Sequence, residues 1–128
     1  MIHVINVSKE DFTFSDNYYY IGRNNCGNIL SNPYTYLPLE KTIALYQCKS
    51  REEAIKNYEV YFDTMYGHNK EFTEKIDEIY EKYKNGEEIF LGCWCSPKSC
   101  HGDVIKKKLE QRLIKEKIKE KKNGSRRD

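Results

Sequence analysis

The chain has 128 residues, 33% of them charged, and a formal net charge of +2. This length fits one domain, and no apolar run is long enough to cross a bilayer, so we do not expect a membrane-spanning protein. The N-terminus lacks the basic and apolar regions of a secretory signal, which favours a cytoplasmic location. The five cysteines are an odd number, which argues against a disulfide scaffold.

β-Branched and aromatic runs predict strands in the N-terminal part, and clusters of Gly, Asn and Pro predict turns between them. The expected elements are a strand at residues 2–7, a loop at 8–17, a short aromatic strand at 18–22, a turn at 22–28, and an irregular segment at 29–49 with a turn at Asn32-Pro33.

Two amphipathic helices are expected next. Ser50 followed by Glu53 is a capping-box pattern, and apolar residues at helical spacing continue from there to Gly67. A second apolar stripe begins at Phe72 and leads to Gly86, a residue suited to the end of a helix.

The C-terminal part predicts a buried strand, a short loop and a long helix. Residues 89–95 are apolar on both faces, as in a strand covered by helices on each side. The following helix begins near Ser99 or Cys100, and its last residues, past Ile118, are expected to fray. This order predicts an α/β protein: a small Rossmann-like layered fold with a mostly parallel sheet, flanking helices and a long C-terminal helix. We expect a single domain at 1–113 and a basic, partly frayed helical extension at 114–128.

The strand-to-helix turn at residues 93–103 is the first candidate site. Ligands of open α/β sheets bind beyond the carboxyl ends of the strands, and a helix N-terminus suits an anion such as phosphate. Gly102 would let a ligand approach the backbone. The same position would favour a Cys100 thiolate with His101 as its partner, and Asp103 lies near this chemistry. Because neighbouring residues of a helix do not face each other, a direct dyad of Cys100 and His101 is geometrically doubtful.

A metal site is an alternative for the same turn. Cys93, Cys95, Cys100 and His101 offer soft ligands for zinc, although their spacing differs from the usual knuckle. The simpler interpretation is that Cys93 and Cys95 are small core residues, and no cofactor is expected.

Two further groups of residues could contact a ligand or a nucleic acid. Gly22 and Arg23 follow a strand, where Arg23 could bind a phosphate or carboxylate. Asn32 could fix its loop or contact a base. Residues 106–128 hold 11 Lys or Arg against 4 Asp or Glu, a net charge of +7. This basic tail is either a solvated helix end or a contact for nucleic-acid phosphates.

Five runs of residues together form a family-like pattern: Val4-Ile5-Asn6, Tyr20-Ile21-Gly22-Arg23, Ser31-Asn32-Pro33-Tyr34, Arg51-Glu52-Glu53-Ala54, and the specific run Cys93-Trp94-Cys95-Ser96-Pro97-Lys98-Ser99-Cys100-His101-Gly102-Asp103. In these runs the chain resembles a family known only as domain of unknown function 4326, which occurs in bacteria and their phages. Ser31 stands where the family pattern has Gly, and the basic tail after Leu113 lies outside the resemblance.

A looser likeness to a second uncharacterised family, which has Cys-His-Arg at a helix start, suggests a pocket for nucleotide-like compounds. Our leading hypothesis is therefore binding of a phosphate-bearing, nucleotide-like small molecule, with a phage or bacterial signal nucleotide as the candidate ligand. The expected ligand-binding residues are Asn6, Tyr20, Gly22, Arg23, Asn32, Pro33, Tyr34, Trp94 and Gly102. The alternatives are an enzyme acting on a nucleotide or modified base through Cys100, His101 and Asp103, and a zinc-binding nucleic-acid or protein adaptor.

Overall fold

The computed structural model describes residues 1–24, 27–96 and 98–125. Asn25 and Cys26 of the predicted turn, and Pro97 of the predicted loop, lie outside the described residues. In chain order the elements are β1 (Ile2–Asn6), β2 (Tyr18–Tyr20), β3 (Tyr34–Thr35), the 3-10 helix η1 (Leu39–Lys41), β4 (Tyr46–Gln47), α1 (Arg51–Met65), α2 (Lys70–Lys84), β5 (Ile89–Cys93) and α3 (His101–Ser125).

The main sheet has the order β1-β5-β2, and both outer strands run parallel to β5. Asn6 of β1 lies opposite Cys93, and Tyr20 of β2 lies opposite Gly92. The carboxyl ends of these strands therefore meet at the turn that leads into α3. This arrangement confirms the predicted α/β fold with a mostly parallel sheet and a long C-terminal helix.

The two faces of the sheet are covered differently. Helices α2 and α3 pack on one face, where Ile89 and Leu91 are fully buried. On the other face the ring of Phe12, from the loop before β2, stacks on Phe90 with 4.1 Å between ring centroids. A loop side chain thus covers a position where the apolar sequence of β5 predicts a helix. Any apolar ring can bury such a residue, so the pattern alone does not identify what covers it.

The helices form because their apolar positions recur on one side. Residues of α1, α2 and α3 that fill the core are Ala54, Tyr58, Phe62, Phe72, Ile76, Ile79, Tyr80, Val104, Ile105 and Leu109. The Ser50 hydroxyl accepts the Glu53 N–H at 3.1 Å, as the capping-box pattern predicts. Gly67 and Gly86 both adopt positive φ just past α1 and α2, which explains why these helices stop there.

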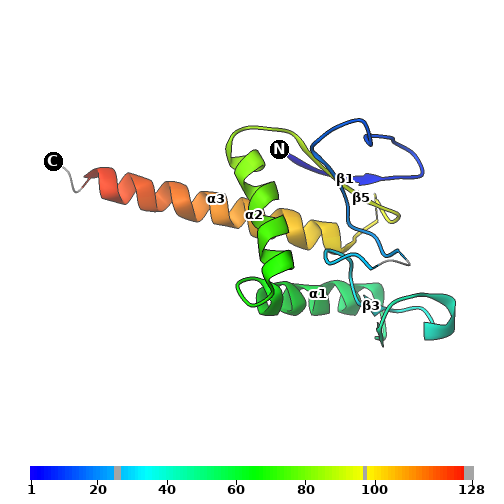
Figure 1. Cartoon of the computed structure of the whole chain (residues 1–128). Coiled ribbons are helices and arrows are strands. Elements are labelled where there is room, and N and C mark those ends of the chain that lie inside the picture. Colours follow the sequence, from blue (N-terminus) through cyan, green and yellow to red (C-terminus); the bar gives the residue numbers. More distant parts are fainter. Residues whose placement is uncertain (25–26, 97, 126–128) are drawn as a thin grey trace.

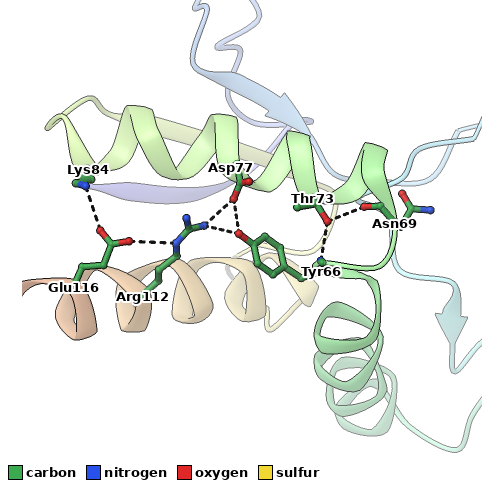
Figure 2. Close-up of polar contacts among 8 residues, drawn as sticks. Tyr66, Asn69, Thr73, Asp77, Lys84, Arg112 and Glu116 are labelled. Carbon is green, nitrogen blue, oxygen red and sulfur yellow. Dashed lines mark hydrogen bonds and ion pairs between the residues drawn. The ribbon is translucent and has the colours of Figure 1, made fainter. Parts of the chain in front are cut away.

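An ion-pair network connects α2 to α3 (Figure 2). The Arg112 guanidinium donates to Asp77 at 2.9 Å and to the Tyr66 hydroxyl at 3.0 Å. It also lies over the ring of Tyr80, with 3.9 Å from its central carbon to the ring centroid. Glu116 extends the network from Arg112 to Lys84.

Helix α3 continues to Ser125, and its C-terminal end projects away from the other elements (Figure 1). The backbone is thus helical as far as Ser125, and partial fraying of the predicted helical extension at 114–128 stays a prediction. Within the described residues, none of the helices is both long and apolar enough to span a membrane.

Candidate functional site

A pocket of about 410 Å³ lies beside the carboxyl ends of β2 and β5, between the 93–101 turn and the start of α1. Among the residues that the sequence predicts, it brings together Gly22, Arg23, Asn32, Tyr34, Trp94, Cys100 and His101. Its other lining residues are Thr35, Tyr36, Lys41, Thr42, Ile43, Arg51, Ala54, Ile55, Cys93, Cys95 and Ser99. The pocket thus joins the two sequence clusters that stand about 70 residues apart in the chain.

The charge of the lining is one-sided. Arg23, Lys41 and Arg51 line the pocket, and the described lining residues include neither Asp nor Glu. A cavity with cations and no acidic counterpart favours an anionic occupant.

Arg23 is held from one side by backbone oxygens. Its guanidinium donates to the carbonyl of Asn32 at 2.8 Å and to that of Tyr34 at 3.4 Å. Partial burial lowers the pKa of Arg23, because the charged form loses hydration. The carbonyl oxygens replace only part of that hydration. A bound anion would supply the negative charge that balances the guanidinium.

Arg51 is the main residue that our site prediction missed. It is the first residue of α1 and bridges to the 93–101 turn by donating to the Ser99 carbonyl at 3.4 Å. It also donates to the Tyr36 hydroxyl at 3.0 Å. Desolvation opposes its charge, but contacts with Cys95 and Tyr36 outweigh this and raise the pKa of Arg51. The only signal in the sequence is its place in the family motif, which we interpreted as a helix start.

Asn32 supports the pocket wall through both ends of its amide. The side chain is 6% exposed, donates to the Ala54 carbonyl at 3.1 Å and accepts the Tyr34 N–H at 3.0 Å. Because these bonds use the amide internally, Asn32 links α1, β3 and Arg23. Its neighbour Pro33 lines an adjacent hollow instead of this pocket.

Trp94 stands at the mouth of the pocket with 62% of its surface exposed. Its indole N–H donates to the Tyr20 hydroxyl at 2.8 Å, and that hydroxyl donates to the Arg23 carbonyl at 3.2 Å. Asn6 donates to the carbonyls of Trp94 and Ser96, at 3.2 and 2.9 Å. Tyr20 and Asn6 are not themselves among the lining residues; Tyr20 holds Arg23 and Trp94, and Asn6 holds Trp94.

The Cys100 and His101 side chains point to different partners. A ring nitrogen of His101, Nε2, lies 2.7 Å from the Ile21 carbonyl. Burial lowers the pKa of His101 to about 4, so the imidazole is neutral at pH 7 and its Nε2–H donates to that carbonyl. The Cys100 thiol instead donates to Cys93, with 3.5 Å between the sulfurs. The two side chains thus point to different partners, in agreement with the argument from helix spacing against a direct dyad.

The start of α3 is already capped. The Asp103 carboxylate accepts the Cys100 N–H at 3.1 Å, and the Cys100 sulfur accepts the Gly102 N–H at 3.3 Å. A Cβ on Gly102 would stand 2.8 Å from Ile21 and 3.0 Å from Val4. Neither Gly102 nor Asp103 lines the pocket, and Gly102 serves close packing against the sheet.

Two other predictions bear on metals and nucleic acid. Among the described residues, no group of three or more His, Cys, Asp or Glu side chains is arranged to hold a metal ion, and so the geometry does not support zinc. In the first half of α3, Lys107, Lys108 and Arg112 form ion pairs with acidic residues of α1 and α2. Nucleic-acid contact by the basic tail stays a prediction.

The fold and the pocket together define a small parallel α/β domain with a cationic, aromatic-walled cavity at the carboxyl edge of its sheet. The chain belongs to the family described as a domain of unknown function, DUF4326, whose model matches residues 5–111. No curated protein and no solved structure matches the chain.

Proposed function

We propose that the protein binds a phosphate-bearing, nucleotide-like small molecule in the pocket, with the guanidinium groups of Arg23 and Arg51 around the phosphate. The observation that carries this proposal is the lining itself: three cationic side chains and, among the described residues, no acidic one. Guanidinium groups suit phosphate because their N–H groups form a planar fork that matches its oxygens.

Aromatic residues provide the surface for the remainder of the ligand. Tyr34, Tyr36 and Trp94 line the same cavity, and Trp94 is exposed although it is the largest apolar side chain there. A planar base that stacks on an exposed indole covers this apolar surface, which is favourable for both groups. The volume of about 410 Å³ is in the range of cavities for single small molecules, so we expect one mononucleotide-sized occupant.

Trp94 is the only tryptophan of the chain, so its fluorescence reports on the pocket directly. We would titrate the protein with nucleoside monophosphates and, separately, with the matching nucleosides. Nucleotides should bind more tightly than their nucleosides, and the difference should shrink as salt is raised, because the phosphate contact is electrostatic. Equal binding of nucleoside and nucleotide would remove the phosphate from the proposal.

The matched variants are Arg51→Met and Lys56→Met. Both remove one positive charge from α1, but Lys56 is exposed and does not line the pocket. Loss of a charged hydrogen bond to the ligand should weaken nucleotide binding by about 10- to 100-fold in Arg51→Met, and Lys56→Met should bind like the unmodified protein. If both variants bind alike, the Arg51 guanidinium does not hold the phosphate.

A further inference from the structure

The floor of the pocket contains two thiols that the proposed binding function does not use. Cys93 ends β5 and Cys100 directly precedes α3, and both line the cavity. Their residues are only 2% and 4% exposed, yet their sulfurs face each other at 3.5 Å. Six residues of chain lie between them in sequence, so it is the strand-to-helix turn that brings them together.

A chain of hydrogen bonds gives the two sulfurs different roles. The Gly102 N–H donates to the Cys100 sulfur, and the Cys100 thiol donates to Cys93. Donation from Cys100 outweighs burial and lowers the pKa of Cys93 to about 6. The same hydrogen bond, together with burial, raises the pKa of Cys100. Cys93 is therefore the sulfur that loses its proton first, and Cys100 keeps its proton beside it.

We propose that Cys93 and Cys100 form a redox-active dithiol that exchanges with a small, carboxylate-bearing disulfide entering the pocket. The thiolate is the attacking form in such exchange, and the second thiol has to lie within reach of the first sulfur. A disulfide bond measures about 2.05 Å, so the two sulfurs would have to approach by roughly 1.5 Å. Arg23 and Arg51 would attract the carboxylates of the disulfide.

The exchange takes place in two steps. The Cys93 thiolate attacks one sulfur of the disulfide RSSR, forming a Cys93–S–S–R bond and releasing RS⁻, which takes up the proton that Cys93 had given to solvent. The Cys100 thiol then attacks the Cys93 sulfur, the S–S bond to R breaks, and the leaving sulfur departs as RSH with the proton of Cys100. The protein loses two protons and two electrons, and RSSR is reduced to two RSH.

Glutathione disulfide, without any nucleotide, is the probe, so that the result is independent of the proposed ligand. After incubation, remaining thiols are blocked with iodoacetamide and the protein is digested with trypsin and chymotrypsin. Cleavage after Trp94 and Lys98 places Cys93, Cys95 and Cys100 on separate peptides. We expect a Cys93–Cys100 disulfide with no retained glutathione. Intact blocked thiols at both positions, or a disulfide that joins Cys95 instead, would overturn the proposal.

The variant Cys100→Ser should stop the reaction after its first step and retain glutathione on Cys93. Serine is a favoured residue at a helix N-cap, so this variant should fold, which circular dichroism would check. The matched control is Cys48→Ser, since Cys48 does not line the pocket, and it should form the Cys93–Cys100 disulfide like the unmodified protein. If folded Cys100→Ser retains no glutathione on Cys93, then Cys93 is not the attacking sulfur and the dithiol assignment is wrong.

Discussion

Lowering the pH should destabilise the protein through His101, well above the range in which carboxylates titrate. Its imidazole packs at 4.8 Å from the ring of Tyr58, measured between centroids, and Nε2 lies 2.7 Å from the Ile21 carbonyl. Burial is the largest cause that lowers the pKa of His101, to about 4, and the nearby Arg23 charge adds to it. In the unfolded chain the pKa of a histidine is about 6.5.

The direction of the effect follows from proton uptake. Between pH 4 and 6.5 the unfolded chain binds a proton at His101 that the folded protein does not, so the free energy of unfolding falls as the pH falls through this window. From the two pKa values, about 2 kcal/mol is lost between pH 7 and pH 5. The carboxylates whose pKa is lowered in the fold, Asp11, Asp77, Glu88 and Glu116, add their loss at lower pH.

Urea unfolding followed by circular dichroism at pH 5, 6 and 7 measures this loss. The control is His101→Gln, whose amide can still donate to the Ile21 carbonyl but does not titrate. The variant should be less stable than the unmodified protein at pH 7 and should show a loss smaller by about 2 kcal/mol between pH 7 and 5. Parallel pH dependence in the two proteins would refute a neutral His101 in the folded protein.

Two further substitutions test the packing around the site. Gly102→Ala gains about 1 kcal/mol in helix propensity but places a Cβ 2.8 Å from Ile21. We therefore expect the free energy of unfolding in urea to fall by about 1 kcal/mol. A stabilised variant would show that the sheet shifts to make room for the Cβ. Arg112→Lys keeps the charge but loses the stacking on Tyr80 and the hydrogen bonds to Tyr66 and Asp77, so the free energy of unfolding should fall by about 1 kcal/mol. Unchanged stability would mean that the charge alone connects α2 and α3.

The fold was predictable where a local pattern determines the structure. The capping box at Ser50 and the glycines after α1 and α2 locate helix ends because caps and positive φ are local requirements. The apolar run at β5 predicts a central strand for the same reason. The short pair of β3 and β4 was not predicted, since two-residue strands leave no periodicity in the sequence.

The location of the candidate site could be predicted from the sequence, but the role of each residue in it could not. Of the residues predicted to bind a ligand, Arg23 and Trp94 line the pocket, whereas Tyr20 and Asn6 support it from outside. Whether these two side chains line the pocket or support it depends on where their hydrogen-bond partners lie in the tertiary structure, and no local pattern in the sequence shows this. Arg51 was missed for the opposite reason: a helix-start motif explains it locally, and only the approach of α1 to the 93–101 turn reveals its second contact.

The central position of β5 also determines when the site can form. Among the residues that the structure describes, both β1 and β2 pair only with β5 in the main sheet, so Ile2 has to wait for Ile89, a partner 87 residues later in the chain. Closing so long a loop is slow, whereas α1 and α2 are neighbours in the chain and can pair early. During synthesis β1 therefore remains without its partner until β5 has been made. The pocket, which needs residues on both sides of that closure, should be among the last parts of the molecule to assemble.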